Sequence, residues 1–160
     1  MPEHALSDRE LAISRLIEGS RDTVFAAFTE VRHLSQWWGP TGFTTTTSTF
    51  EFSEGGVWEF MMHAPDGTDY PNWIKWIEIR PPELIVLRHG ERSDDPEQFT
   101  TSIEFEERPD GTEVTLSTEF QTKALRDKAI EHFGALEAGG ETLRSLAEYV
   151  ATGPRRKDRF

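Results

Sequence analysis

The chain has 160 residues, a formal net charge of −12 and no cysteine. Its length predicts one domain that buries about 70% of the surface that the unfolded chain exposes. The lack of cysteine excludes disulfides, thiolate metal sites and cysteine nucleophiles and favours a reducing, cytoplasmic location, while the negative charge disfavours binding to nucleic acid.

The first nine residues, 1–9, are expected to form a flexible tail before the domain. They contain neither the basic segment nor the apolar segment of a signal peptide. Along the whole chain, no apolar run approaches the roughly 20 residues that cross a bilayer, so we expect no membrane insertion.

The first predicted elements are one strand and two short helices. Residues 10–17 predict a strand. Ser20 is a suitable N-cap for a short helix, in which Val24, Ala27 and Phe28 recur at three- and four-residue steps. A second short helix over residues 33–37 is ended by a Gly-Pro pair.

The middle of the chain predicts β-structure. Threonine, valine and aromatic residues dominate its strands, and turns such as Pro-Asp-Gly separate them. Strands joined by short turns without helices between them predict an antiparallel meander. The expected strands are residues 43–52, 57–63, 72–79, 84–89, 99–106 and 112–120.

The last predicted element is a long helix over residues 123–151, capped by Thr122. Its apolar residues follow one another at steps of three or four and form a continuous stripe. Gly139 and Gly140 in its middle cost about 1 kcal/mol each relative to alanine. Two explanations remain open, a close approach of the helix to the sheet and a kink. Residues 152–160, which include a short basic cluster, are expected to form a second tail, so that the domain spans residues 10–151.

Two tryptophan motifs indicate a pocket. The first is Gln-Trp-Trp-Gly-Pro at residues 36–40, and the second is Gly-Gly-Val-Trp-Glu-Phe at residues 55–60. A buried indole needs a partner for its N–H group, so a tryptophan beside residues that end a helix or strand suits the wall of a pocket better than the interior of a core.

The same motifs resemble the family named after the activator of the 90-kDa heat-shock protein ATPase, in the START-like, polyketide-cyclase-like (SRPBCC) superfamily. The resemblance covers about residues 10–151, and its motifs are residues 36–40, Phe43, 55–60, 65–67, 70–71, 78–83 and 112–118. It implies an α+β helix-grip fold, in which a curved antiparallel sheet of about seven strands wraps around a long C-terminal helix and leaves an internal cavity.

The chain also departs from this family. The family often has an aspartate and an arginine where this chain has Glu51 and Ser53. Trp73, Lys75 and Trp76 stand where a small residue is more usual. These departures predict a smaller or more aromatic pocket.

The alternation of side chains along each strand gives the candidate pocket residues. Trp58, Phe60 and Met62 share one face of their strand, and we expect that face to point inward. In strand 72–79 two alternating sets compete for the inward face, and a one-residue bulge would exchange them. One set is Trp73, Lys75, Ile77 and Ile79, and the other is Asn72, Ile74, Trp76 and Glu78. The candidate ligand-binding residues are Trp37, Trp38, Phe43, Trp58, Phe60, Met62, Trp73, Leu87, His89, Ile103, Leu116, Thr118, Phe120, Phe133 and Glu137.

Each candidate also has a structural explanation. Trp58 and Phe60 could pack in the core, and His89 could be a hydrogen-bonded interior histidine. If the protein catalyses a reaction, His89, Glu137 and Glu78 are the candidate acid–base residues. No two of the five histidines have the spacing of metal ligands, and no cofactor motif is present, so we expect neither a metal nor a cofactor.

Three functions are compatible with these features. The favoured one is binding of a small hydrophobic ligand (lipid-, polyketide- or aromatic-like) without strong catalysis. The second is an enzyme of the polyketide cyclase or dehydratase type. The third, which the resemblance implies, is a co-chaperone-like interaction module, although the co-chaperones carry a further N-terminal domain that is not expected here. Self-association into a homodimer is a further expectation that the sequence leaves open.

Overall fold

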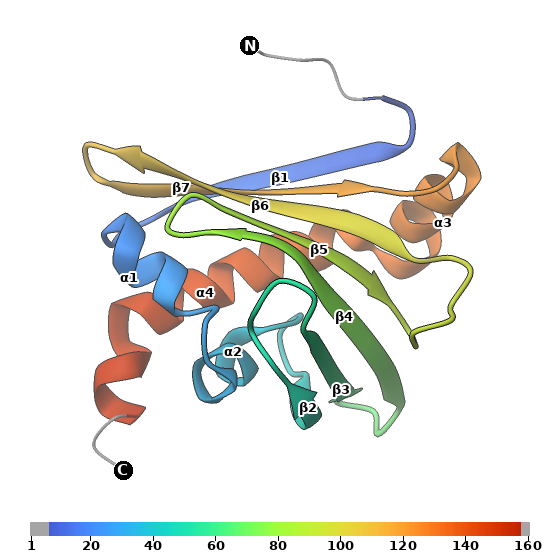
Figure 1. Cartoon of the computed structure of the whole chain (residues 1–160), viewed down its shortest axis with the longest axis horizontal. Coiled ribbons are helices and arrows are strands. Elements are labelled where there is room, and N and C mark those ends of the chain that lie inside the picture. Colours follow the sequence, from blue (N-terminus) through green and yellow to red (C-terminus); the bar gives the residue numbers. More distant parts are fainter. Residues whose placement is uncertain (1–6, 158–160) are drawn as a thin grey trace.

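The computed structural model describes residues 7–157 as one curved antiparallel sheet with four helices (Figure 1). The expected tails, residues 1–9 and 152–160, lie partly outside the described residues. In chain order the elements are β1 (Glu10–Ile17), α1 (Arg21–Ala26), α2 (Val31–Trp37), β2 (Thr44–Phe50), β3 (Val57–His63), β4 (Asp69–Arg80), β5 (Leu84–Gly90), β6 (Phe99–Arg108), β7 (Gly111–Glu119), α3 (Lys123–Phe133) and α4 (Ala135–Lys157).

The sheet has seven strands in the order β1-β7-β6-β5-β4-β3-β2. All neighbouring strands are antiparallel, and β2 to β7 follow one another as a meander. The first strand β1 pairs with the last strand β7, so that β1 and β2 form the two edges. Figure 1 shows helix α4 crossing the concave side of this sheet. The predicted helix-grip fold is therefore confirmed.

A bulge in β4 resolves which side chains of this strand face the helix. The pairing of β4 with β5 shifts between Trp76 and Glu78, and Ile77 is left 40% exposed. Before the bulge, Ile74 and Trp76 are fully buried in the core, and Asn72 has the same parity. Both open interpretations of this strand are thus partly correct, because the extra residue exchanges the two faces.

The C-terminal segment forms two helices, so the prediction of one continuous helix over residues 123–151 is wrong. Helix α3 ends at Gly134, whose φ of 60° and ψ of 42° place it in the left-handed region. Glycine adopts this conformation without the steric cost that a Cβ atom brings. The chain therefore turns at Gly134, and α3 and α4 can take different directions over the sheet.

Of the two explanations left open for the glycine pair, a close approach of the helix to the sheet and a kink, the structure supports the close approach. A Cβ atom at Gly139 would lie 2.4 Å from Cδ1 of Ile13 on β1, whereas a Cβ atom at Gly140 would meet nothing within 4 Å. Gly139 thus permits a close approach of α4 to the sheet, and Gly140 does not contribute to it.

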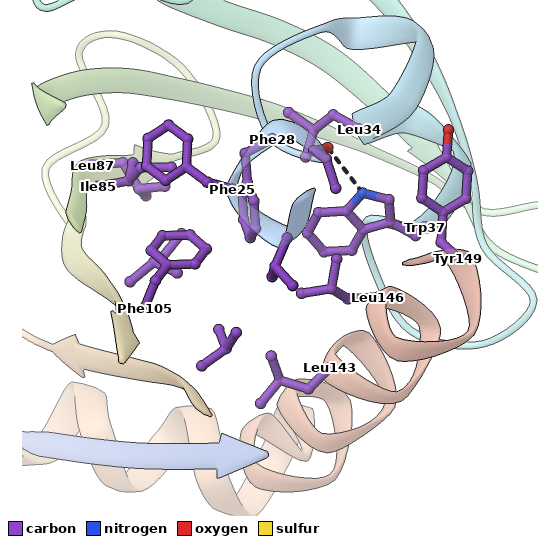
Figure 2. Packing of buried hydrophobic residues seen from close by; sticks show 14 of the residues in the cluster. Phe25, Phe28, Leu34, Trp37, Ile85, Leu87, Phe105, Leu143, Leu146 and Tyr149 are labelled. Atoms are coloured by element: carbon purple, nitrogen blue, oxygen red, sulfur yellow. Dashed lines mark hydrogen bonds between the residues drawn. The ribbon is translucent and has the colours of Figure 1, made fainter. Parts of the chain in front are cut away.

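The core lies between the concave face and helices α1, α2 and α4 (Figure 2). Its rings form a chain of contacts in which Phe25 lies 5.0 Å from Phe105, Phe105 lies 5.3 Å from Phe28, and Phe28 lies 4.8 Å from Trp37, measured between ring centroids. Leu143 of α4 closes the core from below. Within residues 7–157, no helix is long and apolar enough to cross a membrane.

Candidate functional site

A cleft of about 310 Å³ opens between helix α3 and the end of the sheet that leads to the β5–β6 loop. Four elements of the sheet side and one helix supply its walls. The walls include Asn72 of β4, His89 of β5, Phe99 of β6, Phe120 after β7, and Leu125 and Phe133 of α3.

The apolar wall of the cleft consists mainly of phenylalanine rings. The ring centroids of Phe99 and Phe120 are 5.3 Å apart, and the His89 ring lies 4.9 Å from Phe99. Phe133 comes from α3 on the opposite side and is 70% exposed. A large apolar side chain exposed at the opening of a cleft can contact a ligand at little cost to the core.

The polar group of the cleft is a hydrogen-bonded pair of side chains. Nε2 of His89 donates to Oδ1 of Asn72 at 2.7 Å, and Nδ2 of Asn72 donates to the carbonyl of Tyr70 at 3.1 Å. Burial lowers the pKa of His89 to about 4, although the nearby Asp95 carboxylate opposes this shift. His89 is therefore neutral at pH 7, with its proton on Nε2 and a lone pair on Nδ1.

One carboxylate organises the β5–β6 loop at the rim of the cleft. Asp95 accepts hydrogen bonds from the backbone N–H groups of Glu91, at 2.9 Å, and Glu97, at 2.8 Å. Its partial burial raises the pKa of Asp95, but these hydrogen bonds outweigh that effect and bring the pKa below its usual value. The loop thus keeps Asp95 ionised and holds Glu91 and Glu97 beside the cleft.

Helix α3 covers the cleft without entering the core. Thr122 caps its first turn by accepting a hydrogen bond from the backbone N–H of Leu125, and Nε of Arg126 donates to the carbonyl of Glu10 on β1. No residue of α3 is fully buried. The helix thus contacts the rest of the protein through half-buried residues and through the hydrogen bond of Arg126 to β1.

Three of the predicted ligand-binding residues, His89, Phe120 and Phe133, line this cleft. Most of the others belong to the core or pack against it. The buried ones are Trp37, Trp58, Phe60, Met62, Leu87 and Ile103, and the partly buried ones are Trp38, Phe43 and Leu116.

The indole groups have their hydrogen-bond partners inside this core. Nε1 of Trp37 donates to the carbonyl of Ala27 at 3.1 Å, the bond drawn in Figure 2. Nε1 of Trp58 donates to Oγ1 of Thr47 at 3.0 Å, and the Trp58 ring stacks on Phe60 with centroids 3.8 Å apart. These tryptophans do not border the cleft.

The remaining predicted residues lie elsewhere. Trp73 is buried, but it has the opposite parity to the inward-facing Ile74 and lies outside the main core cluster. Thr118 exchanges a hydrogen bond with Thr101 at 3.1 Å. The candidate acid–base residues Glu78 and Glu137 do not line the cleft: Glu78 pairs with Arg80 at 2.7 Å, and Glu137 is exposed in the first turn of α4.

Sequence reasoning missed several residues of the cleft. Phe99 lies four residues before the predicted candidate Ile103 on the same strand, so the alternation of side chains could have identified it. Asn72 belonged to one of the two open sets of strand 72–79. Leu125 belonged to the predicted apolar stripe but was not assigned to the pocket, and Lys128 gave no signal, because the position of α3 depends on the break at Gly134.

Two other polar sites are weaker candidates for a ligand-binding site. On the outer face of the sheet, His63 bonds Oγ1 of Thr46 through Nε2 at 2.8 Å and Oδ1 of Asp69 through Nδ1 at 2.7 Å. This has the connectivity of a hydroxyl–imidazole–carboxylate triad, but Thr46 and Asp69 are exposed and no described pocket surrounds them. A second hollow of about 370 Å³, near Arg80 and Glu104, is lined mainly by charged residues.

The chemistry available inside the cleft is apolar contact and neutral hydrogen bonding, and charged side chains stand at its rim. No group of three or more His, Cys, Asp or Glu residues in the described part of the chain could hold a metal ion. Since His89 is oriented by an amide and not by a carboxylate, the pair resembles a ligand-orienting site more than an activated general base.

Comparison with known proteins identifies the family of this fold. The family model of the activator of Hsp90 ATPase homolog 1-like proteins matches residues 18–151. No curated protein sequence matches the chain.

Solved structures with the same fold have low sequence identity to this chain. A protein from Nitrosomonas europaea has a TM-score of 0.82 and 21% identity, with 98% of this chain and 100% of that chain covered. A protein from Arthrobacter aurescens has a TM-score of 0.82 and 22% identity, with 90% and 87% covered. The AHSA1 protein from Silicibacter pomeroyi has a TM-score of 0.72 and 22% identity, with 89% and 97% covered. At these identities the structural similarity establishes the fold alone.

Proposed function

The chain belongs to the family of activator of Hsp90 ATPase homolog 1-like proteins, and we propose that it binds a small, largely apolar molecule in the cleft beneath helix α3. The observation that supports this proposal is the cleft of about 310 Å³, which is lined both by three phenylalanine rings and by the hydrogen-bonded pair His89 and Asn72. An apolar enclosure with a few oriented polar groups is typical of small-molecule sites.

The size of the cleft, about 310 Å³, limits the ligand to about three rings or a short chain. Burying about 150 Å² of apolar ligand surface contributes roughly 4 kcal/mol before the costs of binding are subtracted. Micromolar affinity would then require further contributions from shape and from the Asn72–His89 pair.

Binding without catalysis is favoured over a cyclase or dehydratase activity. The cleft offers one neutral imidazole, whose Nε2 is engaged with Asn72. The other two candidate acid–base residues, Glu78 and Glu137, lie outside the cleft. The absence of cysteine supports a cytoplasmic site of action as part of the same proposal.

The test is a fluorescence titration with the neutral dye N-phenyl-1-naphthylamine. We expect its fluorescence to rise on binding to the wild type, and Phe133→Ala to weaken the affinity about five- to tenfold. The matched control is Leu136→Ala, because this exposed apolar residue lies three positions further along but does not line the cleft. Phe99→Leu, inside the cleft, provides a second variant that should also weaken binding.

Two results would contradict the proposal. One is the absence of any saturable binding of the dye to the wild type. The other is equal affinity in the wild type and in the Phe133→Ala and Phe99→Leu variants, since binding would then occur elsewhere.

A further inference from the structure

The rim of the cleft has an uneven charge. The β5–β6 loop contributes three carboxylates, those of Glu91, Asp95 and Glu97, whereas helix α3 contributes one ammonium group, that of Lys128. Both oxygens of Asp95 are used by the loop itself. Glu91 and Glu97 are exposed, and they are the carboxylates available to a ligand.

These two carboxylates have little competition from the protein's own cations. Glu97 forms no ion pair with any residue between 7 and 157. Glu91 lies 3.7 Å from Arg92, but the Arg92 guanidinium is closer to Asp94, at 2.8 Å. A positively charged ligand group at the rim would therefore meet carboxylates that are largely unneutralised.

The aromatic wall favours a cation independently of the carboxylates. The face of an aromatic ring attracts positive charge through its quadrupole. The protein already uses this interaction at the opening, where Nζ of Lys128 lies 5.9 Å from the centroid of the Phe133 ring. The rings of Phe99 and Phe120 lie in the same cleft.

An anionic ligand would find few partners in the same place. Lys128 is the one cationic side chain among the described lining residues, and it lies over Phe133. His89 is neutral at pH 7 and cannot pair with an acid group. The net charge of −12 on the whole chain repels anions further.

We propose that the ligand of this cleft is a cationic amphiphile, with an apolar or aromatic body between the phenylalanine rings and a terminal amine or quaternary ammonium group beside Glu91 and Glu97. The inference rests on the proposed function and adds the charge of the ligand to it. It argues against fatty acids and other anionic lipids as the natural ligand.

Three naphthalene-based probes with different charges test this inference. They are N-(1-naphthyl)ethylenediamine, which is cationic, N-phenyl-1-naphthylamine, which is neutral, and 8-anilinonaphthalene-1-sulfonate, which is anionic. We expect the cation to bind at least fivefold more tightly than the anion at low salt. The difference should shrink in 0.5 M salt, because the rim charges are exposed and are screened.

Charge-neutralising variants show whether the rim is responsible. In the double variant Glu91→Gln/Glu97→Gln, affinity for the cationic probe should fall about threefold per carboxylate removed, the size of a solvent-screened interaction at about 6 Å. Affinity for the anionic probe should rise, and that for the neutral probe should not change. The matched control is Glu59→Gln/Glu104→Gln, which changes the net charge equally at two exposed positions outside the cleft.

The outcomes separate the inference from the function on which it rests. If the neutral probe binds and is sensitive to Phe133→Ala, but the anion binds as tightly as the cation, the inference is overturned and the proposed function stands. The inference is equally overturned if the Glu91→Gln/Glu97→Gln variant and its control bind the cationic probe alike. If no probe binds, both proposals fail.

Discussion

Replacing Gly140 by alanine should raise the free energy of unfolding by about 1 kcal/mol, whereas the same change at Gly139 should not. Both residues lie within helix α4, where alanine is favoured over glycine by roughly that amount. The surroundings differ, because a Cβ atom at Gly140 enters open space and one at Gly139 would lie 2.4 Å from Cδ1 of Ile13. Ile13 would have to leave its rotamer, at a cost of about 0.5–1.5 kcal/mol, which cancels the helical gain.

Thermal unfolding followed by circular dichroism measures both effects. For a chain of this length, 1 kcal/mol corresponds to a change of about 2–4 °C in Tm, so Gly140→Ala should unfold that much later and Gly139→Ala at about the wild-type temperature or below it. In an Ile13→Val background, which lacks the Cδ1 atom, Gly139→Ala should recover its stabilising effect. Equal stabilisation by the two alanines in the wild-type background would refute the close approach of α4 to β1.

Three further predictions concern single side chains. Because the pKa of His89 is about 4, against 6.5 in the unfolded chain, only the unfolded chain takes up this proton between these pH values. Lowering the pH from 7.5 to 4.5 should therefore reduce the urea-derived stability of the wild type by about 2–3 kcal/mol more than that of His89→Gln, and equal losses would contradict the burial of the imidazole. Trp37→Phe should lower the free energy of unfolding by about 1–3 kcal/mol more than Trp76→Phe does, because it removes the hydrogen-bond donor of the buried Ala27 carbonyl. Nε1 of Trp76 is buried without a described partner, so its removal breaks no such bond. Similar losses in urea unfolding would argue against the hydrogen bond of Trp37. Gly134→Ala should lower the stability by about 1–2 kcal/mol because of its left-handed backbone, and an unchanged Tm would show that α3 and α4 do not break there.

The sequence predicted the sheet more accurately than the C-terminal helices. Turn residues such as Pro-Asp-Gly are local signals, so the limits of the strands follow from neighbouring residues. The break between α3 and α4 at Gly134 has no such signal, because the apolar stripe continues through it. The glycine itself does not reveal the break, since glycine adopts positive and negative φ values about equally readily. The glycine pair at residues 139–140 was the more conspicuous feature, but its role is packing against Ile13.

The candidate site was predicted only in part, because it depends on contacts between distant elements. Strand parity placed His89 correctly relative to the sheet, but the side on which Asn72 lies is decided by the bulge after Trp76. The tryptophan motifs suggested a pocket, since an indole N–H needs a partner when it is buried. Those partners are a carbonyl of α1's C-terminal turn and a threonine of β2, and neither could be identified without the fold.

The packed core and the open cleft are made of different residues, so that the residues that stabilise the fold are separate from those of the proposed binding site. Helices α1, α2 and α4 cover the concave face of the sheet, and the rings of Trp37, Trp58 and Trp76 have less than a tenth of their surface exposed. Helix α3 buries no residue completely, yet it supplies one wall of the cleft and the exposed ring of Phe133. Substitutions on the cleft face of α3 should therefore alter ligand affinity with little effect on folding. Because that face and the β5–β6 loop can change without disturbing the core, related chains with the same fold can differ in the ligands that they bind.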